Sequence, residues 1–215
     1  MTKSHRRAPG AGPGAAWWER GDLPIRASRA VLRALAWFPL LSLAWAAARD
    51  SLGPEPVEAL LHGTGQWALR LLLASLAITP ARRWLGLGWL APLRRSFGLM
   101  AALYASLHLA TYLTLEVELD PRLLVEDVVE RAYVSAGFAA WLLLALLAVT
   151  STRGWKRRLG RRWRPLHRLA YPAAGLGVLH FVWLVKADLR EPLLHATILG
   201  LLLLARLPRR SGRGT

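Results

Sequence analysis

Long apolar segments separated by short polar ones set the pattern of this 215-residue chain. Each segment holds roughly 16–21 residues, and about 20 residues of helix, rising 1.5 Å each, cross the hydrocarbon core of a bilayer. A helix also satisfies its own backbone hydrogen bonds, which lipid requires. The pattern therefore predicts an all-α membrane bundle of six transmembrane helices, at Val31–Ala48, Leu60–Thr79, Phe97–Leu115, Ala132–Val149, Pro165–Val185 and Pro192–Leu207.

Charged side chains are distributed unequally between the segments that connect these helices. The N-terminal region, the second and fourth connections and the C-terminus hold 22 of the 29 Lys and Arg residues but only two acids, Glu19 and Asp22. The alternate connections hold the other 11 acids and five bases. Because cytoplasmic loops carry the excess of Lys and Arg, both termini are predicted to be cytosolic. The largest outer loop, Glu116–Arg131, is acidic.

The chain is expected to form one domain with two basic extensions. Residues 1–30 are rich in Gly, Pro and basic residues and lack the apolar core of a signal peptide, so we expect a disordered cytosolic arm. Residues 31–207 would form the transmembrane domain and residues 208–215 a basic tail. No internal repeat is evident.

The amino-acid composition excludes several classes of function and cofactor. A net charge of +16 would also suit a nucleic-acid binder, but the long apolar segments exclude that class and make membrane lipids the surroundings. The chain has no cysteine, which excludes disulfides, iron–sulfur clusters and a cysteine nucleophile. Redox chemistry would therefore need histidine-bound metal or an organic cofactor.

Two histidines, His108 and His180, lie inside the third and fifth segments. An ionisable group inside a membrane is costly and is a functional candidate by default. His108 precedes Glu116 by eight residues and His180 precedes Lys186 by six, which places them about 12 and 9 Å from the outer ends. At such similar depths they could ligate one iron from opposite faces, and bis-histidine ligation suits electron transfer. The alternative for each is a neutral histidine hydrogen-bonded between helices.

The other histidines have more open interpretations. His167 lies about 20 Å deeper than His180 on the same helix, where it could hold a second, inner redox group or face headgroups and water. His62 could bind a heme propionate or cap its helix. His195 resembles an interface residue, and His5 belongs to the arm.

Two arginines and several small residues are further candidates. Arg70, well inside a segment, could pair with a propionate or extend to the outer interface. Arg168 adds to the inner positive charge and could help bind a flavin phosphate or an acidic donor, although the positive-inside rule explains most of that charge. Gly98, Gly175 and Gly177 would let a flat macrocycle or another helix approach closely.

Three stretches carry a resemblance to a known family. They are HGTGQWALRLLLASLAITP from residue 62, RRSFGLMAALYASLHLATYLTLE from residue 94, and TSTRGWKRRLGRRWRPLHRLAYPAAGLGVLHFVWLVK from residue 150. With these motifs the chain resembles the ferric-reductase-like transmembrane family, and within it the heme-binding membrane subunits of bacterial protein-methionine-sulfoxide reductase systems. The resemblance covers nearly all of residues 31–207.

The resemblance implies cofactors, partners and ligands. Such subunits hold heme b, and FMN is also attributed to them. They take electrons from the quinone pool or a cytosolic flavin reductase and pass them to a periplasmic molybdopterin enzyme, MsrP, which reduces methionine sulfoxide. The family's heme histidines map onto His108, His167 and His180.

One departure from the wider superfamily affects the heme count. NADPH oxidases hold two stacked hemes with paired histidines, but Arg94 stands fourteen residues before His108 here, so His167 has no partner at that spacing. One heme held by His108 and His180 is therefore the better-supported count. Two other functions remain open, a stand-alone ferric or quinone reductase and a non-redox transporter or scaffold. We expect the electron donor to be a separate protein or quinol.

Overall fold

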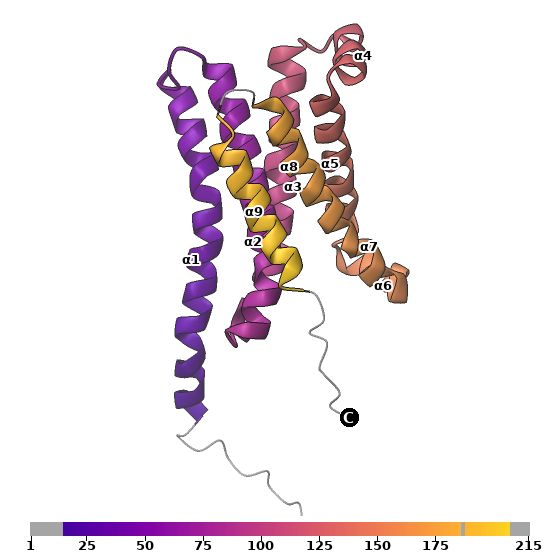
Figure 1. Ribbon diagram of the computed structural model, residues 1–215. Helices are drawn as coiled ribbons and strands as arrows, with labels where there is room; N and C mark the ends of the chain where they lie inside the picture. The colour runs from indigo at the N-terminus through magenta and orange to yellow at the C-terminus, as the bar shows by residue number, and fades with distance from the viewer. Residues whose placement is uncertain (1–14, 186–187, 207–215) are drawn as a thin grey trace, which may run out of the picture.

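The computed structural model describes residues 15–185 and 188–206, which form an up-and-down bundle of helices (Figure 1). The six long helices are α1 Ala15–Ala48, α2 Pro56–Trp84, α3 Leu93–Thr111, α5 Ala132–Val149, α8 Ala170–Leu184 and α9 Arg190–Leu204. The shorter ones are η1 Gly88–Leu90, the π-helical η2 Tyr112–Glu116, α4 Pro121–Glu130, α6 Arg153–Leu159, η3 Gly160–Arg162, α7 Trp163–Leu166 and η4 His167–Leu169. Within these ranges there is no strand, which confirms the all-α prediction.

Three helical segments of the described chain are long and apolar enough to cross a membrane by length and composition: Pro24–Ala48, Leu93–Glu116 and Ala132–Val149. The other long helices are less clear-cut. α8 and α9 have 15 residues each, and α2 carries Arg70 in its middle and two arginines in its last turn. The structure thus supports a helical membrane protein, and the count of six crossings stays a prediction.

The first helix begins earlier than the sequence suggested. α1 starts at Ala15, so part of the range expected to be a disordered arm, residues 15–30, is helical. This stretch is rich in Ala and Arg, which favour helix, and it continues directly into the apolar segment. Residues 1–14, with His5, and the expected tail 208–215 lie outside the described residues.

The fifth segment and the outer loop also differ from the uniform helix and loop that the pattern predicts. Pro165 and Pro172 have no backbone N–H, so the helix is interrupted, and α7, the 3₁₀ turn η4 and α8 replace one continuous span. The acidic outer loop contains α4, where the Asp120 side chain accepts a hydrogen bond from the Arg122 N–H and Pro121 occupies the first helical position.

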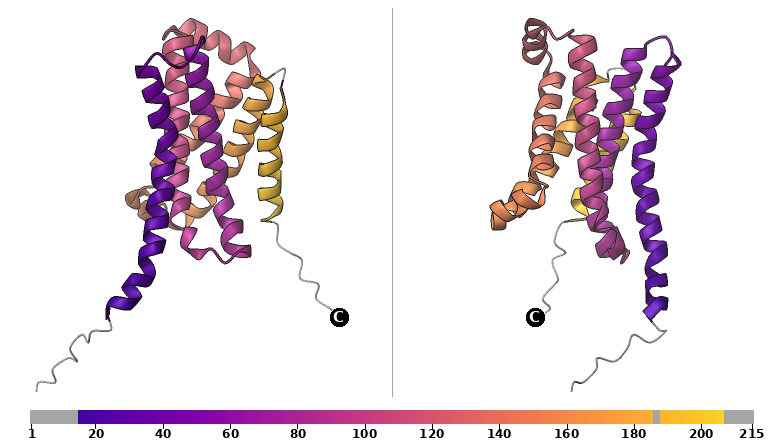
Figure 2. Two further views of the ribbon diagram at one scale, coloured as in Figure 1. Left: turned by 90° about the vertical axis from the view of Figure 1, so that its left-hand side faces the viewer. Right: turned by 180° about the vertical axis from the view of Figure 1, so that it is seen from behind.

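Two helix pairs form the centre of the bundle. α2 packs along α3, α5 packs along α8, and α3 and α5 join the two pairs. α9 lies against α2 and α8, and α1 lies against α2 and α3 (Figure 2). The Tyr104 hydroxyl fixes α1 to α3, because it donates to the Ala36 carbonyl at 2.9 Å and accepts from the Leu40 N–H at 2.8 Å.

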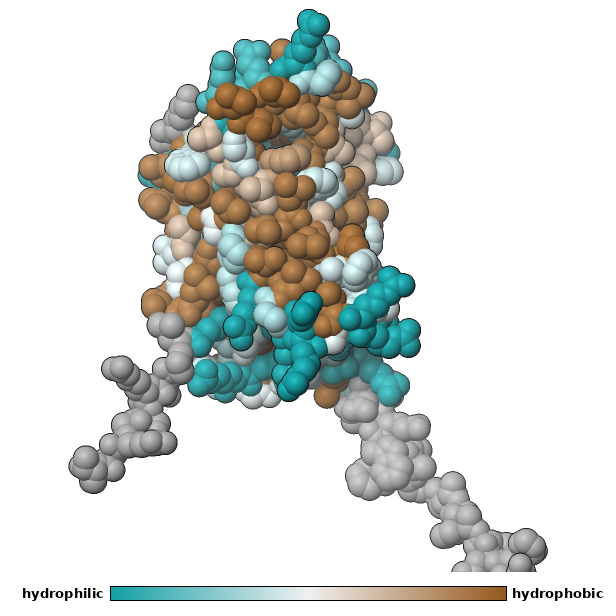
Figure 3. Space-filling model, turned by 90° about the vertical axis from the view of Figure 1, so that its right-hand side faces the viewer, coloured by the Kyte–Doolittle hydropathy of each residue, from teal (hydrophilic) through white to brown (hydrophobic). Residues whose placement is uncertain are grey.

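The surface has an apolar band between two polar ends. On the face in Figure 3, hydrophobic side chains cover the middle and hydrophilic ones gather at both ends. Large apolar side chains point outward, among them Phe38 and Trp45, at 67% and 62% exposure. A water-soluble monomer rarely exposes so much contiguous apolar surface. The start of α1, the basic helix α6 and the end of α9 lie at one end, and acidic α4 lies at the other (Figure 1). We call the first the inner end and the second the outer end, after the orientation that the loop charges predict.

Candidate functional site

The structure brings His108 of α3 and His180 of α8 together. Their ring centroids lie 6.0 Å apart, and the ring planes are nearly perpendicular, at 83°. Both side chains are partly buried, and they lie three residues before the end of α3 and four residues before the end of α8. The sequence placed these two residues at similar depths from their helix ends, and the tertiary fold adds that they face each other.

Each of these histidines is oriented by a backbone carbonyl. Nδ1 of His108 lies 2.9 Å from the Leu61 carbonyl oxygen of α2, and Nδ1 of His180 lies 2.7 Å from the Tyr133 carbonyl oxygen of α5. A carbonyl oxygen can only accept, so Nδ1 carries the proton and donates in both bonds. In the neutral ring Nε2 then holds the lone pair, which is the tautomer of a metal-ligating histidine whose other nitrogen is fixed by a backbone carbonyl.

A glycine lies beside each ring. Gly65 follows Leu61 by four residues on α2, and Gly137 follows Tyr133 by four residues on α5. A Cβ atom at Gly65 would lie 3.1 Å from Nδ1 of His108, and one at Gly137 would lie 2.7 Å from Nδ1 of His180. Real Cβ contacts essentially never fall under 3.0 Å, so at Gly137 the imidazole would have to move. The two glycines therefore allow the rings to reach the carbonyls.

The two halves of this arrangement repeat one local design. The sequence separation between carbonyl and histidine is 47 residues in both, and in both a helix carrying carbonyl and glycine precedes the helix carrying the histidine. The repeat is not evident in the sequence, since little residue identity accompanies the geometry. The other candidate glycines have different surroundings. Gly98 and Gly177 face Ser75 and Leu69 at ordinary contact distances, as in plain helix packing, and Gly175 has no neighbour within 4 Å.

The spacing of the two rings can be tested against one shared iron. Imidazole–metal bonds are about 2 Å long and a ring centroid lies about 1 Å behind its nitrogen, so one metal between two Nε2 atoms needs centroids about 6 Å apart. The observed separation is 6.0 Å. No group of three or more His, Cys, Asp or Glu side chains that could hold a metal occurs within the described residues. The donor set thus fits an ion with four other ligands of its own, as in heme.

His167 is in a different environment. Its ring stacks on Trp163 with centroids 4.0 Å apart, and Nε2 lies 3.3 Å from the Thr150 hydroxyl oxygen. That hydroxyl donates to the Leu146 carbonyl, so it accepts from His167, and the proton is on Nε2 rather than on Nδ1. Arg94 donates to the Thr79 hydroxyl at 3.2 Å. Among the residues that the structure describes, no second histidine contacts His167.

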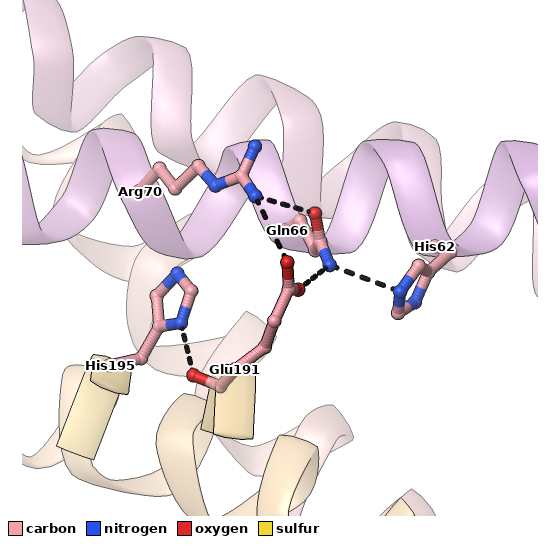
Figure 4. Close-up of polar contacts among 5 residues, drawn as sticks. All are labelled: His62, Gln66, Arg70, Glu191 and His195. Carbon is pink, nitrogen blue, oxygen red and sulfur yellow. Dashed lines mark hydrogen bonds and ion pairs between the residues drawn. The ribbon is translucent and has the colours of Figure 1, made fainter. Parts of the chain in front are cut away.

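A polar network connects the outer ends of α2 and α9 (Figure 4). Gln66 is at its centre, with its amide NH₂ donating to the Glu191 carboxylate and lying 3.0 Å from Nε2 of His62. Its carbonyl accepts from Arg70 at 2.8 Å, and Arg70 also approaches Glu191 at 4.0 Å. His195 is 5% exposed and donates from Nδ1 to the Glu191 backbone carbonyl, so it is a core residue rather than an interface residue.

The network borders the histidine pair through Phe181, the neighbour of His180. The Phe181 ring makes edge contacts with His62 at 6.0 Å and with His195 at 5.7 Å. His62 and Arg70 were predicted from the sequence as candidate heme-binding residues, but their partners were not. Gln66 and Glu191 can be recognised as partners only once α9 packs on α2. Arg168 lies exposed in η4, and the structure does not bring it to the histidine pair.

The chain is similar to known redox membrane proteins. The model of the family "Ferric reductase like transmembrane component" matches residues 64–178. A protein of Rhodospirillum rubrum is 54% identical over 185 residues, which cover 81% of this chain and 88% of that protein. One of Xanthomonas axonopodis pv. citri is 49% identical over 185 residues, covering 83% and 85%. Both are named protein-methionine-sulfoxide reductase heme-binding subunit MsrQ.

Proposed function

Since the chain belongs to the ferric-reductase-like transmembrane family, and within it to the MsrQ redox subunits of protein-methionine-sulfoxide reductases, we propose that it transfers electrons through one heme b held by His108 and His180. One observation carries the proposal. Two Nδ1–H groups are fixed by backbone carbonyls, which leaves two Nε2 lone pairs on rings whose centroids have the separation that one shared iron requires. Heme would supply one-electron redox chemistry there, and two axial histidines suit electron transfer rather than oxygen binding.

The protein's own residues prepare this site. Three helix contacts fix the rings: α2 against α3, α5 against α8, and α3 against α5. Because the carbonyls and glycines belong to helices, the ligands are positioned before any cofactor binds. This reduces the conformational entropy lost on binding. His62 and Arg70 lie in the network beside Phe181. There the Arg70 guanidinium could form an ion pair with a heme propionate in place of its ion pair with Glu191.

We further infer six crossings of the bacterial inner membrane, with both termini cytosolic. The six long helices match the six apolar segments of the sequence in position, and the basic connections gather at one end (Figures 1 and 2). The 15 residues of α9 rise only about 22 Å, which local thinning of the bilayer can accommodate.

Because the sequence contains no cysteine, single substitutions test this topology. A membrane-impermeant maleimide should label Asp50→Cys in intact spheroplasts and Arg83→Cys only after lysis. The reverse pattern would contradict the orientation.

Electrons are proposed to travel outward, from quinol or a cytosolic flavin reductase to a periplasmic molybdopterin subunit, MsrP. FMN, attributed to related subunits, would be a further cofactor at the inner end near Arg168. The acidic outer helix α4 and the basic inner end give the two faces opposite charge for different partners.

The decisive experiment follows reoxidation of the dithionite-reduced purified protein by stopped-flow absorbance. MsrP should reoxidise the heme much faster than ferric citrate does. The reverse order would favour a stand-alone ferric reductase, and a colourless protein without a b-type spectrum would exclude a redox role.

A further inference from the structure

A small pocket opens at the inner end of the bundle, away from the histidine pair. It has a volume of roughly 240 Å³ and is lined by Thr79, Pro80, Arg83, Tyr171, Ala205 and Arg206. Along α2, Thr79 lies about 27 Å from Leu61, the carbonyl that fixes His108. The pocket is therefore separate from the proposed heme site.

Pro80 explains why Arg206 occupies the wall of this pocket. Pro80 has no N–H, so the Leu76 carbonyl loses its partner within α2. Arg206 donates to that carbonyl and also to the Tyr171 hydroxyl, and its guanidinium carbon lies 4.9 Å from the centre of the Tyr171 ring. Its buried Nε has no acceptor among the described residues. The guanidinium is thus held in one orientation by neutral groups only.

The pocket is cationic and its charge is uncompensated. Arg83 forms another part of the wall, and Arg94 donates to Thr79, which lines the pocket. Among the side chains that the structure describes, none of the three arginines forms an ion pair with a carboxylate. Like charges gathered at a partly buried site repel one another, and a bound anion would remove that repulsion.

The positive-inside rule accounts for exposed arginines such as Arg82 and Arg95, which remain hydrated. It does not account for Arg206, which is partly buried and fixed at a cavity. We propose that this pocket binds a phosphate group. Arginine forks match phosphate geometry, and basic pockets between membrane helices on the cytoplasmic side bind lipid headgroups.

The size of the pocket limits what can enter it. Sites for whole small molecules usually measure about 300–1,000 Å³, so roughly 240 Å³ suits a headgroup and not a complete macrocycle or flavin ring. Two sources share this chemistry: the headgroup of an anionic phospholipid such as phosphatidylglycerol, and the phosphate of FMN with its ring outside the pocket.

The test compares Arg83→Gln with Arg82→Gln. Both residues are exposed on the last turn of α2 and lose the same charge, but only Arg83 lines the pocket. The proteins are reconstituted in phosphatidylcholine nanodiscs. Phosphatidylglycerol retention is measured by native mass spectrometry against phosphatidylcholine, and FMN binding is measured by fluorescence quenching against riboflavin, which lacks the phosphate.

We expect Arg83→Gln to weaken binding of the phosphate-bearing probe about tenfold, the effect of one lost charge-assisted hydrogen bond, and Arg82→Gln to change it less than twofold. Preference for phosphatidylglycerol or for FMN identifies the source. Equal effects of the two substitutions, or no preference for either phosphate-bearing probe, would overturn the proposal. Heme content should be unchanged in both variants, so the outcome is independent of the heme assignment.

Discussion

The two helix pairs α2–α3 and α5–α8 are alike at their outer ends and different at their inner ends. At the outer ends, each places a histidine on a backbone carbonyl and against a glycine. At the inner ends, α3 presents Arg94 to Thr79, whereas the segment before α8 presents His167 to Thr150. The outer ends therefore hold two histidines in equivalent surroundings, the proposed heme ligands, and the inner ends hold a cation and a single stacked histidine.

This difference separates His108 and His180, the proposed ligands, from His167. His108 and His180 have their Nδ1 protons fixed by carbonyls, which leaves the Nε2 lone pairs on two rings whose centroids lie 6.0 Å apart. His167 has Nε2 occupied by Thr150 and one face covered by Trp163. What separates them is the second partner of each ring, which tertiary packing provides.

Removing a ligand should have the largest effect. His108→Ala and His180→Ala should each abolish stable heme, because one axial ligand cannot hold the iron in a site built for two, whereas His167→Ala should retain most of it. The pyridine hemochrome content per purified chain measures this. Equal heme retention in all three variants would contradict the assignment of the ligands.

Crowding the rings should have the next largest effect. Gly137→Ala places a methyl group 2.7 Å from the His180 ring and should reduce heme content severalfold, and Gly65→Ala, at 3.1 Å, should reduce it less. Gly200→Ala on α9 is the matched control, because no atom lies within 4 Å of its Cβ position. If the control lost as much heme as Gly137→Ala, general helix destabilisation would explain the result.

The polar network of Gln66, Arg70 and Glu191 should change the midpoint potential of the heme without being required for heme binding. Arg70→Gln removes a positive charge, which disfavours the more negative reduced state and should lower the midpoint potential, whereas Glu191→Gln should raise it. Each shift should be on the order of tens of millivolts, as for a charge at about 10 Å in a medium of intermediate dielectric. Potentiometric titration of the α-band measures both. Shifts of the same sign would refute an electrostatic role.

Removing the hydrogen-bond partner of His167 should have the smallest effect on the heme site. Thr150→Val keeps the shape of the side chain but removes the hydroxyl, which should cost about 1 kcal/mol of stability and leave heme content and potential unchanged. Thermal unfolding and the reduced spectrum measure the two quantities separately. A changed heme spectrum would show that the inner end contributes to the redox site.

The sequence predicted the all-α class and two histidines at similar depths, and the structure brings His108 and His180 together. The sequence did not predict the groups that orient the two rings. Ala132–Val149 was predicted with the bounds that α5 has, and the all-α class is confirmed. Three features were not predicted: the interruption of the fifth helix near Pro172, the start of α1 before residue 31, and helix α4 inside the outer loop. The same holds for Gly65, Gly137 and Glu191, whose roles depend on residues more than forty positions away.

The physical reason lies in the range of the interactions. The length of an apolar segment and the charge of a loop are local properties, because the bilayer places its requirements on each helix and each loop separately. The sequence by itself therefore determined a helical membrane protein with two histidines at comparable depth. Backbone carbonyls and missing Cβ atoms carry no side-chain signature that identifies a partner. Only when α2 packed on α3 and α5 on α8 did a carbonyl and a glycine meet each ring. The tertiary structure thus decided that His108 and His180 lie side by side, and which groups orient their rings.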